Sequence, residues 1–230
     1  MDALWCVIPA AGKGVRAGGD RPKQYQHVAG RPLLDHTLER LAAHPLIAGL
    51  MVVIAADDTH FASIDQVRGK PLLTTVGGSE RSYSVLAGIE ALPDSVGPDA
   101  FVLVHDAARP FVGRAVIDAV IAHARAGEGA VAAIRVSDTL KQAAAEDATR
   151  VVRTVPRDGL WRAQTPQGFP RAVLERAYAA ARGEGGATDD AALVERTGVS
   201  VRLVPDSPRN MKVTTSEDLA LAELLAGQGG

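Results

Sequence analysis

The chain has 230 residues, with 25 Lys or Arg against 27 Asp or Glu and a formal net charge of −2. This length suits one domain spanning residues 1–230, and the balanced charge gives no overall field that would favour nucleic acid or an anionic membrane. Cys6 is the only cysteine, so no disulfide can form within the chain, which fits a reducing compartment.

The first residues, MDALWCVIPA, carry neither the cationic start of a signal peptide nor an apolar run long enough to cross a membrane. No run of 18 apolar residues occurs later in the chain. We therefore expect a soluble, cytoplasmic protein that contacts no membrane.

Apolar runs of strand length alternate with segments of helical period. The predicted strands are 4–8, 50–55, 72–76, 101–104, 130–136 and 199–204. The predicted helices are 33–44, 57–67, 80–92, 113–127, 170–183 and 216–227. Thr214 and Glu217 fit a capping box for the last helix. Strands without a polar face indicate a mostly parallel sheet covered on both sides, that is, a doubly wound α/β fold whose ligands bind at the carboxyl ends of the strands.

One segment, 137–169, interrupts this alternation with two short extended patches separated by polar residues. It is too long for an ordinary connection, so we predict an arm, a hairpin that protrudes from the domain. A protruding hairpin rarely reaches its own active site. We therefore predict a homodimer with arm exchange, in which each arm closes the partner's site.

The loop IPAAGKGVRAGGDRPKQY, residues 8–25, holds four glycines, two arginines and two lysines directly after the first predicted strand. The chain lacks the GxxxxGK[ST] run of a P-loop. Gly12, Gly14 and Ala17 match a loose dinucleotide pattern, but Pro22 interrupts the helix that should follow, and no strand ends in an acidic residue about 20 positions on. The loop is better explained as a wrap for a nucleoside triphosphate, with glycine backbone near the phosphates and with Arg16 and Lys23 as mobile cations.

PAAGKGVR together with PKQY resembles the signature of the cytidylyltransferases of isoprenoid biosynthesis, the family of 2-C-methyl-D-erythritol 4-phosphate cytidylyltransferase. Further motifs follow in the family's order: GGSERSYSVLAG (77–88), VHDAARP (104–110), SDTLK (137–141), LWRAQTPQGF (160–169), ATDDA (187–191) and NMKVTTSEDL (210–219). The resemblance covers nearly the whole chain. It implies a Rossmann-like nucleotidyltransferase that joins CTP to a polyol phosphate and releases pyrophosphate.

The resemblance also implies roles for individual residues. Arg16 and Lys23 would stabilise the transition state, and Arg157 and Lys212 would position the acceptor. The implied nucleotide contacts are Pro9, Ala10, Ala11, Gly12, Gly14, Gly77, Gly78, Ser84 and Asp106. The implied acceptor contacts are Asp106, Arg109, Thr139, Arg157, Thr188 and Lys212. A Mg²⁺ ion would bridge the triphosphate, with Asp106 as its candidate protein ligand.

Two alternatives stay open at this point. A pentitol phosphate such as ribitol 5-phosphate could replace the acceptor, since relatives that use it share the same nucleotide loop. The chain could instead be a nucleotide-binding regulatory module without turnover. His105 is interpreted as a packed strand residue, because nothing in this reaction requires a proton carrier.

Overall fold

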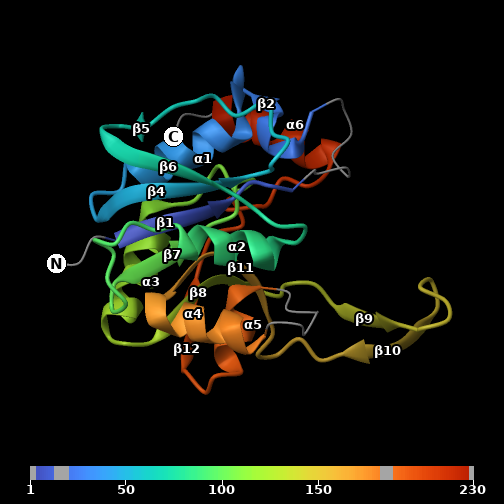
Figure 1. The fold of residues 1–230 in the computed structure, drawn as a ribbon. Coiled ribbons are helices and arrows are strands. Elements are labelled where there is room, and N and C mark those ends of the chain that lie inside the picture. Colours follow the sequence, from blue (N-terminus) through green and yellow to red (C-terminus); the bar gives the residue numbers. More distant parts are fainter. Residues whose placement is uncertain (1–3, 13–20, 182–188, 228–230) are drawn as a thin grey trace.

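The computed structural model describes residues 4–12, 21–181 and 189–227. Within these residues, the main sheet has eight strands in the order β12-β8-β11-β7-β1-β4-β6-β5 (Figure 1). Its strands are β1 (Leu4–Pro9), β4 (Ile47–Ile54), β5 (Gln66–Val67), β6 (Lys70–Val76), β7 (Phe101–Val104), β8 (Gly129–Arg135), β11 (Trp161–Pro170) and β12 (Val201–Pro205). All six predicted strands lie in this sheet.

Most neighbouring strands of the sheet run parallel. β1 pairs in parallel with β4 on one side and β7 on the other, and β4 with β6 and β8 with β12 do the same. β11 is antiparallel to both β7 and β8, and the short β5 is antiparallel to β6. The predicted mostly parallel α/β fold is confirmed. The chain builds outward from β1 to β4 and then returns to β7, so the strand order reverses beside β1, where open α/β sheets bind ligands.

Helices cover both faces of the sheet. The helices concerned are α1 (Leu33–Ala42), α2 (Arg81–Glu90), α3 (Arg114–Arg125), α4 (Arg171–Ala180) and α5 (Asp190–Glu195). Helices α1 and α3 share one apolar core, and α2, α4 and α5 share the other. Alternate residues of β1 serve the two cores, with Cys6 and Ile8 in the first and Trp5 and Val7 in the second. The strand is apolar throughout because both of its faces are buried.

A smaller cluster joins α6 (Ser216–Gly227) to the strand pair β2 (His27–Val28) and β3 (Arg31–Pro32). Its buried core contains Val28, Leu33, Val213 and Ala222. The amide of Val213 donates to the carbonyl of Ala108 at 2.9 Å. This bond holds the segment before α6 beside the loop that follows β7.

The prediction of a helix at 57–67 is wrong. The carboxylate of Asp58 accepts hydrogen bonds from the amides of His60 and Phe61 at 2.8 and 3.0 Å, and from the hydroxyl of Tyr25 at 2.6 Å. A side chain that satisfies nearby backbone amides in this way stabilises a turn in place of a helix. The segment is irregular until its last two residues, which form β5.

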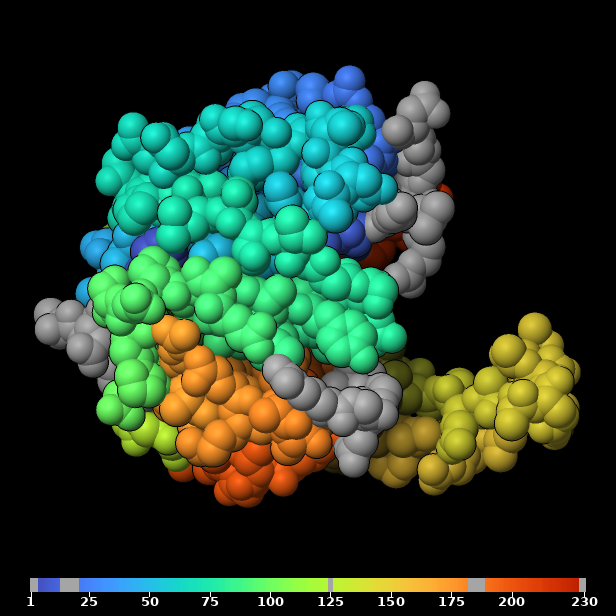
Figure 2. Space-filling model, viewed as in Figure 1, coloured from blue at the N-terminus to red at the C-terminus, as the bar shows by residue number. Residues whose placement is uncertain are grey.

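The arm boundaries are also corrected. Residues 161–169, which were predicted to belong to the arm, form most of β11 inside the main sheet. The strand was missed because its buried half carries polar residues, among them Thr165 and Gln167, which are buried with hydrogen-bond partners. Only β9 (Leu140–Ala143) and β10 (Val151–Val155), which pair antiparallel, extend away from the main body (Figures 1 and 2).

Helix α6 begins at Ser216 as predicted, but its capping box lies one residue later than predicted. The amide of Asp218 donates to the hydroxyl of Thr215 at 3.2 Å, and the carboxylate of Asp218 accepts from the amide of Thr215 at 3.0 Å. This reciprocal pair is the capping box, in place of the predicted Thr214 and Glu217. The carboxylate of Asp218 also accepts from the amide and the hydroxyl of Thr214.

Candidate active site

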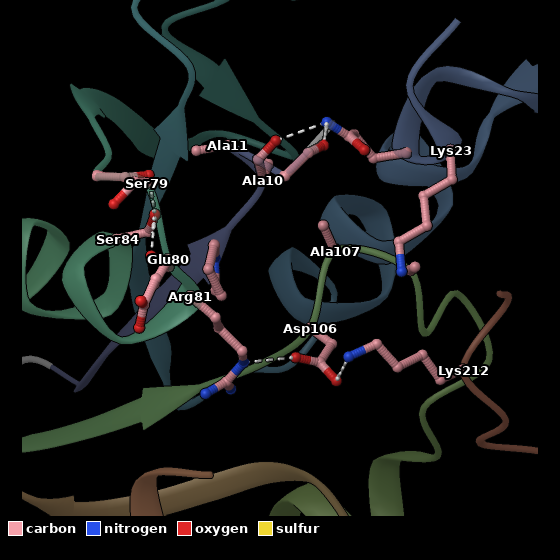
Figure 3. A pocket seen from close by; sticks show the side chains of 15 residues that line it. Ala10, Ala11, Lys23, Ser79, Glu80, Arg81, Ser84, Asp106, Ala107 and Lys212 are labelled. Atoms are coloured by element: carbon pink, nitrogen blue, oxygen red, sulfur yellow. Dashed lines mark hydrogen bonds and ion pairs between the residues drawn. The ribbon is translucent and has the colours of Figure 1, made fainter. Parts of the chain in front are cut away.

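A pocket of about 330 Å³ opens at the carboxyl ends of β1, β6 and β7 (Figure 3). Its lining residues are Pro9, Ala10, Ala11, Gly12, Lys23, Gln24, Gly78, Ser79, Glu80, Arg81, Ser84, Asp106, Ala107, Ala108 and Lys212. The pocket lies beside β1, at the reversal of strand order, as the fold class predicts. Lys23 and Lys212 lie on one side of it, and Ser79 and Ser84 lie on the other.

The first wall of the pocket is the backbone that leaves β1. The amide of Ala10 donates to the carbonyl of Val53 at 2.7 Å, which continues the β1–β4 ladder. The side chain of Gln24 donates to the carbonyls of Ala10 and Gly12 at 2.6 and 3.1 Å. Gln24 is buried, so the short helix η2 (Lys23–Tyr25) holds residues 10–12 at the pocket wall. Gln24 was not predicted as a site residue, although it lies in the PKQY motif.

The second wall is the turn between β6 and α2. The hydroxyl of Ser84 donates to the carbonyl of Glu80 at 3.1 Å and approaches that of Gly78 at 3.4 Å. A Cβ at Gly77 would lie 2.6 Å from the Ser84 Oγ, and one at Gly78 would lie 2.4 Å from the Tyr83 Cβ. Both glycines are therefore required by close packing.

A buried carboxylate, Asp106, forms ion pairs with three cationic side chains. Its Oδ1 accepts from the Arg81 Nε at 3.1 Å, and its Oδ2 lies 3.1 Å from the Arg109 Nε and 3.0 Å from the Lys212 Nζ. Burial alone would raise the pKa of Asp106, but Arg81, Lys212 and Arg109 hold that pKa well below its usual range. Asp106 therefore stays ionised and positions the cations that line the pocket.

Asp190, the first residue of α5, forms an ion pair with Arg81 and so connects the residues around Asp106 to α5. Arg81 donates to both oxygens of Asp190, from Nη1 at 3.1 Å and from Nη2 at 2.9 Å. Burial would lower the pKa of Arg81, but Asp190 and Asp106 raise it above its usual value. Arg81 was not singled out from the sequence because a lone Arg in the GGSERSYS motif gives no sign of a buried partner more than 100 residues away.

His105 lies behind Asp106 at the end of β7 and is fully buried. Its Nε2 pairs with the carbonyl of Arg109 at 3.1 Å, and its Nδ1 pairs with the hydroxyl of Thr165 at 3.0 Å. Burial lowers the pKa of His105 to about 4, so the imidazole is neutral at physiological pH. These contacts agree with its interpretation as a packed strand residue.

The profile of the 2-C-methyl-D-erythritol 4-phosphate cytidylyltransferase family matches residues 4–228. The chain belongs to this family. The resemblance expected from the motifs is thus confirmed, and these matches support neither ribitol 5-phosphate as the acceptor nor a regulatory module without turnover.

Curated members of the cytidylyltransferase family are similar over nearly the whole chain. A 2-C-methyl-D-erythritol 4-phosphate cytidylyltransferase of Xanthomonas campestris pv. campestris (strain B100) is 49% identical over 223 residues, covering 96% of this chain and 83% of the relative. One of Xylella fastidiosa (strain 9a5c) is 49% identical over 222 residues, covering 96% and 95%.

Solved structures of cytidylyltransferases share the fold. The crystal structure of a 4-diphosphocytidyl-2C-methyl-D-erythritol synthase matches with a TM-score of 0.83 at 31% identity, covering 98% of this chain and 100% of that chain. The enzyme of Thermus thermophilus matches with a TM-score of 0.77 at 35% identity, covering 96% and 98%.

The structure brings together most of the residues that the family resemblance implied. Those that line the pocket are Pro9, Ala10, Ala11, Gly12, Lys23, Gly78, Ser84, Asp106 and Lys212. Gly77 packs behind Ser84, and Arg109 is buried against Asp106. Gly14, Arg16 and Thr188 lie outside the described residues.

Two implied acceptor contacts, Thr139 and Arg157, lie on the β9–β10 hairpin and do not line this pocket. Thr139 is exposed at the start of the β9–β10 hairpin, and Arg157 is exposed at its end. Arg157 donates from Nη1 to the carbonyl of Ser137, which closes the base of the hairpin. In the cytidylyltransferase chain as described, these two residues are therefore placed on the hairpin and not among the lining residues.

The described residues of this cytidylyltransferase include no group of three or more His, Cys, Asp or Glu side chains that could hold a metal ion. Asp106 faces the pocket, but both of its oxygens are paired with cations. The side chains of the described residues alone therefore do not form a complete Mg²⁺ site. Within the same described part of the chain, no helix has the length and apolarity needed to cross a membrane.

Proposed function

We propose that this chain transfers the cytidylyl group of CTP to 2-C-methyl-D-erythritol 4-phosphate. The products are 4-diphosphocytidyl-2-C-methyl-D-erythritol and pyrophosphate, and the reaction belongs to isoprenoid biosynthesis. Family membership over residues 4–228 carries this proposal. The cation-lined pocket at the carboxyl ends of β1, β6 and β7 supports it.

The transfer is a displacement at phosphorus. An oxygen of the acceptor phosphate forms a bond to the α-phosphorus of CTP, the bond from that phosphorus to the bridging oxygen breaks, and pyrophosphate leaves. Negative charge grows on the oxygens around the α-phosphorus, and cations already in place stabilise it. We assign this role to Lys23 together with Arg16, and the positioning of the acceptor to Lys212 and Arg157.

No general base is required in this scheme. A phosphate monoester has its second pKa near 6, so the attacking oxygen is already largely ionised near neutral pH. His105 is buried behind the pocket and neutral, in agreement with a reaction that asks for no proton transfer.

The base is read by main-chain groups in this proposal. Ala10, Ala11 and Gly78 present backbone at the pocket wall, and Ser84 adds a hydroxyl. The Ser84 proton is directed at backbone carbonyls, so the oxygen of Ser84 is free to accept a hydrogen bond from an amino group such as that of cytosine. Uracil would present the wrong pattern and leave buried groups unpaired, at about 1–3 kcal/mol each.

We further propose that Mg²⁺ enters bound to the triphosphate of CTP. The oxygen ligands of Mg²⁺ would come mainly from the triphosphate, because both oxygens of Asp106 are already paired with cationic side chains. The ion would neutralise part of the triphosphate charge. Chelation by EDTA should abolish turnover, and added Mg²⁺ should restore it.

We also propose a homodimer in which the hairpin of each subunit completes the partner's pocket. Two observations support it: Thr139 and Arg157 lie at the ends of the hairpin and do not line the pocket, and Val151 and Val152 on β10 are 56% and 55% exposed. Exposed apolar residues on a projecting hairpin are typical of contact surfaces. We place the enzyme in the cytoplasm, as expected from the sequence.

The test of the proposed function measures pyrophosphate release from each of CTP, UTP, ATP and GTP with each of two acceptors. We expect release from CTP with 2-C-methyl-D-erythritol 4-phosphate and little from the other combinations. Equal or faster turnover with ribitol 5-phosphate would reassign the acceptor, and full release from ATP or GTP would refute the base-reading scheme.

A further inference from the structure

Asp190 is a buried carboxylate outside the pocket, and it has no role in the function proposed above. It is 0% exposed, does not line the pocket, and forms the first residue of α5. Its contacts with the described residues include the two guanidinium bonds from Arg81 and a hydrogen bond from the hydroxyl of Tyr178 on α4. Burying an ionised carboxylate is unfavourable unless it is fully paired, so these contacts stabilise its charge.

The guanidinium of Arg81 joins two carboxylates at once. Nη1 and Nη2 bind Asp190, while Nε binds the Oδ1 of Asp106. A guanidinium is planar and its donors have a fixed geometry, so fixing two of them on Asp190 fixes the direction of the third. Figure 3 shows Arg81 reaching from α2 to Asp106 on the floor of the pocket.

Asp190 itself is held on a rigid support. Asp189 accepts from the amide of Ala192 at 3.0 Å, which caps α5. Gln167 on β11 donates to Asp189 at 2.9 Å and accepts from the amide of Ala191 at 2.9 Å. The start of α5 is therefore fixed to the central sheet, and Asp190 is fixed with it.

The charges explain why a second carboxylate is useful. Asp106 alone faces Arg81, Arg109 and Lys212, three cations that would compete for two oxygens. Asp190 neutralises Arg81 from the far side, so the Oδ2 of Asp106 stays directed at Arg109 and Lys212. Without that charge, Arg81 would draw Asp106 toward itself and away from Lys212.

We propose that Asp190 is a positioning residue of the active site, which acts through Arg81 to hold the Asp106 carboxylate against Lys212 and Arg109. The inference rests on the proposed function, because its effect is read as cytidylyl transfer. Asp190 contacts no substrate in this scheme, and Tyr178 assists it by donating to the carboxylate.

The test is a double-mutant cycle of Asp190→Asn and Asp106→Asn, read as kcat/KM for pyrophosphate release. We expect Asp190→Asn to lower kcat/KM by about 10- to 100-fold, as misplacement of a reacting group by about 1 Å does. If Asp190 acts through Asp106, the double variant loses no more than Asp106→Asn alone, within about twofold. Tyr178→Phe should give a smaller loss, which also disappears in the Asp106→Asn background.

Val194→Ala is the matched control, because Val194 is fully buried in the same helix but belongs to the apolar core. It should lower the melting temperature while leaving kcat/KM within about twofold of the wild type. Thermal unfolding of every variant separates loss of folded protein from loss of position. If Asp190→Asn does not fold, the Tyr178→Phe cycle decides the question.

Three results would overturn the inference while the wild type is active: losses that multiply in the double variants, an Asp106→Asn variant with unchanged kcat/KM, or a Val194→Ala loss as large as that of Asp190→Asn. Absence of pyrophosphate release by the wild type would instead overturn the proposed function, and the inference with it. The two failures are therefore distinguishable.

Discussion

At the scale of single residues, the charge of the pocket is set by the cationic side chains around one buried carboxylate, Asp106. Arg81, Arg109 and Lys212 all lie within 3.1 Å of Asp106, and Lys23 enters the same pocket from η2. A bound nucleotide would replace part of this internal pairing with its own phosphates. Such a site is prepared for anions before they arrive, which lowers the reorganisation needed in the transition state.

Replacing Lys23 with Ala should lower kcat by about 100- to 1,000-fold, equivalent to about 2.7–4 kcal/mol, because the ammonium stabilises charge that grows in the transition state. The Kd for CTP, measured by calorimetry, should change much less. Arg21→Ala is the control, because Arg21 belongs to the same loop region but does not line the pocket. Weaker CTP binding with an unchanged kcat would show instead that Lys23 anchors the ground state.

His105 gives a prediction for acid stability. Its pKa is lowered by burial from 6.5 to about 4 in the folded chain. Above pH 6.5 the imidazole of His105 is neutral in both the folded and the unfolded chain. As the pH is lowered from 6.5 to about 4, the unfolded chain binds a proton that the folded chain does not, so the free energy of unfolding decreases. Between about pH 7 and 4.5 the loss due to this group is about 2–3 kcal/mol.

The variant His105→Gln tests this linkage by urea unfolding at both pH values. It should be less stable than the wild type at about pH 7, because it loses packing and a hydrogen bond. Its stability should fall by about 2–3 kcal/mol less than that of the wild type on going to about pH 4.5. Equal losses for the two proteins would mean that the buried imidazole does not control the acid response.

At the scale of elements, the pattern of apolar residues predicted the strands whose buried residues are apolar. It missed the strand β11, whose buried residues are polar and hydrogen-bonded. The strands around β1 were predicted because their residues are apolar on both faces. β11 was missed because Gln164, Thr165 and Gln167 occupy its buried positions, and no local pattern announces their distant partners. The predicted helix at 57–67 failed for the related reason that Asp58 satisfies local backbone amides.

The site shows the same division. Gly12 and Lys23, which line the pocket, could be predicted because they belong to one short run of the sequence. Arg81 and Asp190 could not, since their ion pair depends on how α2 and α5 pack on the same face of the sheet. Residue types near the strand ends suggested a pocket, and the packing of helices decided which charges meet there.

The start of α6 gives a prediction at this scale. Asp218→Ala should destabilise the protein by about 1–2 kcal/mol, because its carboxylate caps the amides of Thr214 and Thr215. Glu217→Ala, at the position that the sequence favoured, should change stability by less than about 0.5 kcal/mol. Chemical denaturation of both variants checks this, and the reverse order would restore the predicted capping box.

At the scale of the whole molecule, the hairpin of β9 and β10 separates two parts of the proposed site. The pocket lies in the main body, whereas Arg157 lies at the base of a hairpin that extends away from it (Figure 1). A two-fold dimer would allow each hairpin to reach the other subunit's pocket. Catalysis would then require assembly.

Mixing Lys23→Ala with Arg157→Ala subunits tests this arrangement. Random exchange makes half of the dimers mixed, each with one intact site and one doubly damaged site, so about a quarter of wild-type activity should return. A mixture of Lys23→Ala with Lys212→Ala is the control and should stay inactive, because both lysines line the same pocket. If subunits exchange and the first mixture also stays inactive, Arg157 serves its own chain.

The most direct test of the proposed reaction follows the acceptor's phosphate oxygens. 2-C-methyl-D-erythritol 4-phosphate labelled with ¹⁸O in its phosphate is incubated with CTP and the enzyme, and the products are analysed by ³¹P NMR and mass spectrometry. Attack by that phosphate on the α-phosphorus predicts that all of the label stays in the diphosphate of the cytidylyl product, including its bridging oxygen, and that the pyrophosphate is unlabelled. Labelled pyrophosphate, or a product whose bridging oxygen is unlabelled, would contradict cytidylyl transfer to the acceptor phosphate.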